Sequence, residues 1–223
     1  MSGTGERARH VRVSLEVSPK KAFATAVDWP GWSRSGKSEE LALEALAAYA
    51  DRYSVVAAEA GESLDRGNSD VVERVGGAGG TEFGVPSAIT DLDRRPVTVA
   101  EAERLARIVA AAWTVFDRVA ARSPAELRKG PRGGGRDRDK IIAHQVEADW
   151  NYATVLGIRE PQPEWNDRRA IEAVRAAILE ALRPPSDGSA IAGRKWPPRY
   201  AARRIAWHAL DHAWEMEDRS EPT

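Results

Sequence analysis

The stretch from Pro198 to Glu217 reads PRYAARRIAWHALDHAWEME and predicts one long, largely buried helix. Proline is favoured in the first turn of a helix, where its missing amide donor costs nothing. Apolar side chains and two histidines then recur at spacings of three and four residues, which places them along one helical face. These positions are Ala201, Ile205, His208, His212 and Met216. We therefore expect His208 and His212 to point into the protein interior.

Three more amphipathic helices are predicted upstream of this one. Each has apolar residues at helical spacing and a recognisable start or end, and their ranges are 98–122, 137–157 and 166–183. Thr98 and Glu101 have the spacing of a capping box, and a pair of prolines ends the last of the three. Four helices of similar length indicate a four-helix bundle, which we expect over residues 91–219.

Residues 1–90 have a different pattern and predict a small module of strands and a helix, so the expected fold class is α+β. Apolar and polar residues alternate over 11–17, which predicts a strand with one buried face. Residues 22–27 return as the second strand of a hairpin. A helix starts after Ser38, and a second, looser hairpin is predicted from 70–75 and 81–83, around the glycine-rich residues 76–80. We place the domain boundary near residue 90.

Three of the four histidines of the chain are placed where they could bind one metal ion. His208 and His212 are one helical turn apart, and His144 lies on the inward line of the predicted helix 137–157. Imidazoles four residues apart can converge on a metal with bonds of about 2.1 Å. Three neutral imidazoles leave coordination positions open, and zinc or nickel suits them best. The alternative interpretation is that these are core histidines satisfied by hydrogen bonds.

Carboxylates accompany the histidines on both helices. Glu147 is three residues after His144, and Glu215 is three residues after His212. Each is a candidate proton carrier for a catalytic reaction, or a group that orients an imidazole. The alternative for each is a solvated acid on the polar edge of its helix.

The segments Lys140-Ile141-Ile142-Ala143-His144 and Trp207-His208-Ala209-Leu210-Asp211-His212 resemble the DinB-like superfamily, over about residues 95–218. This resemblance implies a four-helix bundle that binds a divalent metal through His144, His208 and His212. It further implies a thiol-dependent transferase or isomerase that uses a low-molecular-weight thiol such as mycothiol or bacillithiol. The chain has no cysteine of its own, which is consistent with a thiol supplied by a cofactor. We expect a metal-dependent transferase or hydrolase that activates a thiol or water in a small-molecule reaction.

The N-terminal module carries two competing motifs. Residues 31–38 match the P-loop pattern GxxxxGK[ST], but the module offers a hairpin rather than a parallel sheet and has no later apolar strand that ends in aspartate. We therefore do not expect nucleotide binding. Residues 28–46 resemble HicB-like antitoxin modules, which implies protein contacts and leaves a non-enzymatic scaffold as the alternative function. A plain accessory module is the simpler interpretation.

Composition narrows the classes of partner. Lysine and arginine (33) nearly balance aspartate and glutamate (34), so no net field attracts nucleic acid or a membrane. The residues between Met1 and His10 lack an apolar leader and no long apolar stretch follows, so we expect a cytoplasmic protein.

Trp207 and Trp214 lie on another face than the histidines, which predicts contacts with the N-terminal module or with the second subunit of a homodimer.

A glycine-rich basic loop precedes the helix 137–157. It is a candidate site for an anionic substrate, although a solvated loop is the simpler interpretation. It lacks the aromatic residues that a nucleic-acid stacking platform needs. Its basic residues are Arg128, Lys129, Arg132, Arg136, Arg138 and Lys140.

Overall fold

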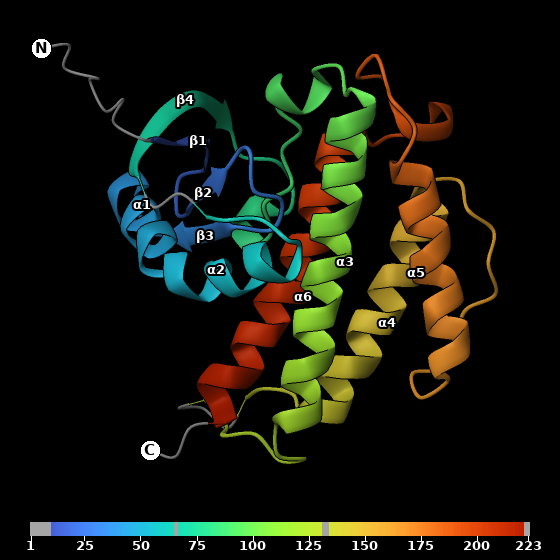
Figure 1. Ribbon diagram of the computed structural model, residues 1–223. Helices are drawn as coiled ribbons and strands as arrows, with labels where there is room; N and C mark the ends of the chain where they lie inside the picture. The colour runs from blue at the N-terminus through green and yellow to red at the C-terminus, as the bar shows by residue number, and fades with distance from the viewer. Residues whose placement is uncertain (1–9, 65–66, 131–133, 221–223) are drawn as a thin grey trace, which may run out of the picture.

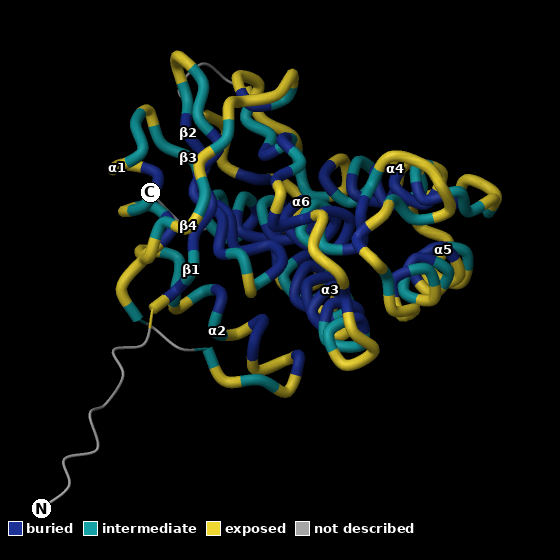
Figure 2. Tube along the Cα trace, turned by 90° about the horizontal axis from the view of Figure 1, so that it is seen from above, coloured by how far each residue is buried: buried dark blue, intermediate teal, exposed yellow. Residues whose placement is uncertain are grey.

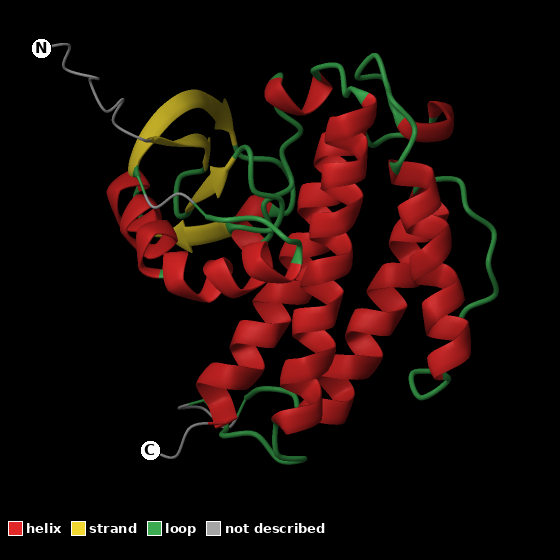
Figure 3. Cartoon of the chain, in the orientation of Figure 1, coloured by secondary structure: helices red, strands yellow, loops and turns green. Residues whose placement is uncertain are grey.

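The computed structural model describes residues 10–64, 67–130 and 134–220, and it has an α+β fold. A four-stranded sheet with two short helices lies on one side of four long helices (Figures 1 and 3). The strands are β1 His10–Val17, β2 Ala22–Ala26, β3 Ser33–Gly36 and β4 Asn68–Gly76. The helices are α1 Glu39–Ala48, α2 Ala50–Glu59, α3 Val99–Arg122, α4 Arg138–Val155, α5 Arg168–Leu182 and α6 Pro198–Ser220. Three short 3-10 helices, η1 Thr81–Phe83, η2 Leu92–Arg94 and η3 Ile191–Gly193, lie in the connections.

The predicted hairpin of β1 and β2 is confirmed, with Leu15 opposite Ala24. The prediction of a single buried face on β1 is wrong, because Ser14 and Glu16 are buried as well. Both lie on the same face of the sheet as Phe23, whose ring packs edge-on against Trp207 of α6. A helix thus covers the face that the alternating pattern assigned to solvent.

The predicted second hairpin is wrong. Residues 70–75 lie within β4, but β4 pairs in parallel with β1, and residues 81–83 form η1 instead of a strand. The crossover through β3, α1 and α2 permits this parallel pairing, which a short loop could not make. The Thr81 hydroxyl donates to the buried Glu16 carboxylate, and this bond holds the segment after β4 against β1.

The sequence pattern also missed strand β3, which lies inside the P-loop match at residues 31–38. The amides and carbonyls of β3 take part in an antiparallel ladder with β2, with Ala24 opposite Arg34. The motif therefore forms an extended strand rather than a phosphate-binding loop. Ser38 caps α1 as predicted, since its hydroxyl accepts from the Leu41 amide.

Helix α6 joins the sheet to the other long helices. It has 23 residues, of which 14 are buried, and Figure 2 shows it enclosed between the sheet and α3 to α5. Gly31 approaches it so closely, at φ +93°, that a Cβ would lie 2.9 Å from side-chain carbons of Ala206 and Leu210. Trp214 packs edge-on against Tyr49. Its contact and that of Trp207 confirm the predicted packing of these tryptophans on the N-terminal module.

One hydrophobic core runs through both parts of the chain. It includes Leu15 and Leu46 of the sheet module together with Phe116, Ile178 and Leu210 of the long helices. The predicted boundary near residue 90 falls between β4 and α3. The predicted capping box of α3 is present, with Thr98 and Glu101 in reciprocal hydrogen bonds. Within the described residues, no helix has the length and apolar character needed to cross a membrane.

Candidate metal centre

Helices α4 and α6 bring His144, His208 and His212 together. Each histidine offers one ring nitrogen, and these three atoms lie within 4.8 Å of one another. The ring centroids are 4.7 to 5.1 Å apart. His208 and His212 are 8% and 9% exposed, and His144 is half-buried. Bonds of about 2.1 Å to a tetrahedral metal require nitrogens about 3.4 Å apart, so the three nitrogens would have to approach one another further to bind one ion.

A buried glutamine fixes the orientation of His208. Gln145 Oε1 lies 2.8 Å from His208 Nδ1, and Gln145 Nε2 donates to Asp149 Oδ1 at 2.8 Å. The Asp149 carboxylate only accepts hydrogen bonds when ionised, so it determines which end of the Gln145 amide faces it. The amide oxygen is then left to accept from Nδ1–H of His208. This arrangement leaves the lone pair of His208 on Nε2.

A carboxylate has the same effect on His212. Glu215 Oε2 lies 2.9 Å from His212 Nδ1, and Glu215 Oε1 accepts from Arg219 Nη1 at 2.7 Å. The hydrogen bond with His212 lowers the pKa of Glu215, which keeps that carboxylate ionised and accepting. His212 therefore also carries its proton on Nδ1 and its lone pair on Nε2. Metal-binding histidines are commonly oriented through the other ring nitrogen in this manner.

The imidazoles of His144 and His208 are neutral at physiological pH. Burial, together with the positive charge of Arg136, lowers the pKa of His144 to about 4. Burial, with the neighbouring His212 and Arg204, lowers the pKa of His208 well below its usual value. A metal ion needs deprotonated ring nitrogens, so no proton has to be displaced from these two rings at neutral pH.

Arg204 lies one helical turn before His208. Its guanidinium carbon is 4.8 Å from the ring centroid of Trp207 and 5.6 Å from that of Tyr152, whose ring in turn packs against His208. Its Nη1 atom is buried without a hydrogen-bond partner among the described residues. Arg204 and the exposed Arg136 thus place positive charge beside the histidine cluster.

The predicted residues of the site differ in their placement. His144, His208 and His212 converge, and Glu215 contacts His212 directly. Glu147 is exposed on α4, and its role as a proton carrier stays a prediction.

Sequence reasoning missed Gln145 and Asp149, which are 0% and 2% exposed. One sequence feature could have revealed them: these two polar residues are four apart and lie next to the helix face that His144 occupies.

Several basic residues of the loop before α4 already pair with acceptor groups of the protein. Arg128 donates to the Asp218 carbonyl, Lys129 pairs with Asp137, and Arg138 donates to the Ser123 carbonyl. Arg132 lies outside the described residues.

Comparison of the chain with protein-family models, with curated proteins and with solved structures yields no match. The residues of the histidine cluster and of its surroundings are therefore the basis for a functional assignment.

Asp149 links the cluster to a buried ion pair. Besides Gln145, its carboxylate accepts from Trp113 Nε1 at 3.1 Å and from Arg175 Nε at 3.2 Å. Burial raises the pKa of Asp149 to about 6, against the opposing effect of Arg175 and these hydrogen bonds. The folded protein consequently binds a proton at Asp149 more tightly than the unfolded chain does.

This raised pKa predicts a pH dependence of stability. Between about pH 4 and pH 6 the folded state holds more protons at Asp149 than the unfolded state, so the free energy of unfolding falls as pH rises. Asp149→Asn removes this contribution. Urea unfolding across that range should show the wild type losing up to about 3 kcal/mol relative to the variant. Parallel stability profiles for the two proteins would contradict the assignment.

Proposed function

We propose that His144, His208 and His212 bind one divalent metal ion, with zinc or nickel preferred. The observation that carries this proposal is that Gln145 and Glu215 occupy Nδ1 of His208 and His212, which leaves two Nε2 lone pairs beside His144. Within the described residues, no hydrogen bond to either Nε2 atom is found. Core histidines that serve only packing tend to use both ring nitrogens, so this pattern favours a metal site.

We further propose that the chain is a DinB-like enzyme, a metal-dependent transferase or hydrolase acting on a small molecule. A Lewis-acidic metal held by three imidazoles would lower the pKa of a bound thiol or water and so supply a nucleophile. The chain itself has no cysteine, so the thiol would be a low-molecular-weight one such as mycothiol. Glu215 accepts a hydrogen bond from His212 Nδ1, and its ionised carboxylate is a proton acceptor in direct contact with the cluster. Arg136 and Arg204 favour a substrate or cofactor with a negative charge.

Metal analysis of the protein purified without a histidine tag tests the first proposal. Titration with zinc or nickel, followed by elemental analysis after desalting, should give about one metal ion per chain. Protein that retains no metal after such loading would contradict the site. Turnover of small electrophiles with a low-molecular-weight thiol is then required for the enzyme. Stoichiometric metal without turnover would favour the scaffold alternative.

Replacing Gln145 by alanine should weaken metal binding by about 10- to 100-fold, as loss of a group that orients a ligand commonly does. The reason is that His208 would lose the acceptor that fixes its protonated nitrogen. Competition with a chelator of known affinity measures the change. Asn151→Ala, which removes an exposed amide from the same helix, is the matched control and should bind metal as the wild type does. Equal affinities for the two variants would show that Gln145 does not orient His208.

A further inference from the structure

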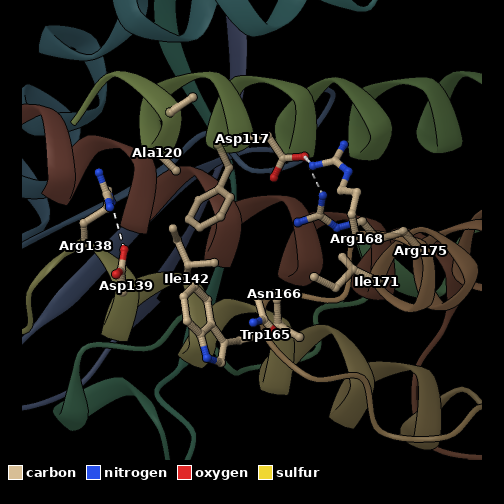
Figure 4. A pocket seen from close by; sticks show the side chains of 13 residues that line it. Asp117, Ala120, Arg138, Asp139, Ile142, Trp165, Asn166, Arg168, Ile171 and Arg175 are labelled. Atoms are coloured by element: carbon tan, nitrogen blue, oxygen red, sulfur yellow. Dashed lines mark hydrogen bonds and ion pairs between the residues drawn. The ribbon is translucent and has the colours of Figure 1, made fainter. Parts of the chain in front are cut away.

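A cavity of about 360 Å³ lies between α3, α4 and α5, on a different face of α4 from the histidine cluster. Ile142 and Val146 of α4 line it, whereas His144 on the same helix faces α6. Figure 4 shows the lining residues, which come from these three helices and from the segment just before α5. This volume is within the range of sites that hold small organic molecules.

One wall of the cavity is apolar and aromatic. Phe116, Ile142 and Ile171 supply buried or half-buried surface, and Trp165 adds a large ring that is 41% exposed. The Trp165 ring lies beside Ile142, as Figure 4 shows. An exposed tryptophan next to a cavity offers a flat apolar surface for a ligand ring, because burial of aromatic surface is strongly favourable.

Three arginines and two aspartates also line the cavity, with a net charge of +1. Arg138 and Asp139 lie at one end, and Asp117, Arg168 and Arg175 lie at the other (Figure 4). Asp117 Oδ2 accepts from Nη1 of both Arg168 and Arg175, at 2.8 and 2.9 Å, which holds the two guanidinium groups side by side. Arg138 donates through Nε and Nη1 to Asp139 and to the Ser123 carbonyl.

All three arginines have used only part of their donor capacity. Arg168 donates through Nε to Glu172, and Arg175 donates through Nε to Asp149. In each of the three side chains, the Nη2 group has no acceptor among the described residues. A guanidinium has five N–H donors, so each arginine keeps donors for a ligand while its position is fixed by the protein.

We propose that this cavity binds a small organic anion with a flat, apolar body, such as an aromatic carboxylate. The body packs against Trp165 and Ile142, and the carboxylate accepts hydrogen bonds from the arginines that Asp117 aligns. The site is separate from the histidine cluster and does not depend on a bound metal.

Two probes of the same shape test this proposal. Naphthalene-2-carboxylate and the uncharged 2-naphthamide are titrated into the full chain, and binding is followed by ligand-observed NMR and by tryptophan fluorescence. The carboxylate should bind about tenfold or more tightly than the amide, because only it makes charge-assisted hydrogen bonds. Its affinity should fall to that of the amide in Arg168→Gln, and both probes should lose affinity in Trp165→Ala.

Arg183→Gln is the matched control, since it removes the same charge near the end of α5 outside the cavity, where Arg183 pairs with Glu103 and Glu180. It should bind the carboxylate as the wild type does. Arg168 and Trp165 are both exposed, and unchanged circular dichroism melting curves confirm that the variants fold. Equal affinity for acid and amide, unchanged binding in both variants, or no binding at about 1 mM carboxylate would each overturn the proposal.

Discussion

The His208→Ala protein is expected to bind zinc or nickel at least about 100-fold more weakly than the wild type, because removal of a ligand should exceed the effect of removing a group that orients one. His208 provides a neutral nitrogen whose proton is held on the opposite side of the ring by Gln145. No other histidine lies near the cluster, since the fourth, His10, is at the start of β1. Elemental analysis and chelator competition measure the loss.

His10→Ala is the control for this experiment, because it removes an exposed histidine far along the chain from the cluster. It should retain the stoichiometry and affinity of the wild type. His208 is buried, so a second variant protects the test against misfolding. His144→Ala changes a half-buried residue on another helix and should also lose metal. Near-stoichiometric metal in both His208→Ala and His144→Ala would refute the site.

The Asp149→Ala protein should lose about 3–5 kcal/mol of unfolding free energy at pH 7, as when one partner of a buried ion pair is removed. Asp149 is 2% exposed and accepts hydrogen bonds from Trp113, Gln145 and Arg175. Alanine leaves the indole and amide donors unsatisfied in the interior, and Arg175 keeps only Asp117 as a partner. Urea denaturation monitored by circular dichroism gives the change.

Asp139→Ala is the control for that measurement. Asp139 is an exposed aspartate in the first turn of the same helix and pairs with Arg138 at the surface. Its removal should change stability by no more than about 1 kcal/mol. A loss of similar size in the two variants would contradict the structural role assigned to Asp149.

The long helices show how much of this fold local sequence determines. Their apolar spacing and end signals predicted α3, α4, α5 and α6 to within two to three residues of the observed bounds, and Thr98 and Glu101 form the predicted capping box. The same periodicity predicted that His208 and His212 face the interior. These features depend on residues within a few turns of one another, so the sequence carries them directly.

The sheet shows where local pattern is insufficient. β4 was predicted as a strand but assigned to a neighbouring partner, whereas it crosses over α1 and α2 to pair with β1. β3 is short and polar, with no alternation to reveal it, and is recognised only by its ladder with β2. Strand partners are chosen by contacts distant in the chain, which no local window contains.

The sequence by itself determined the four long helices, the β1–β2 hairpin and the histidines that face inward, because each follows from the spacing of side chains along one element. Only the tertiary structure decided that His144 approaches the pair on α6, that Gln145 and Asp149 orient His208, and that three arginines line one cavity. Most of those arrangements join residues that are far apart in the chain, such as His144 and His212 on separate helices. They arise because packing a sheet and four helices around one core fixes which polar groups meet, and buried polar groups must find partners there.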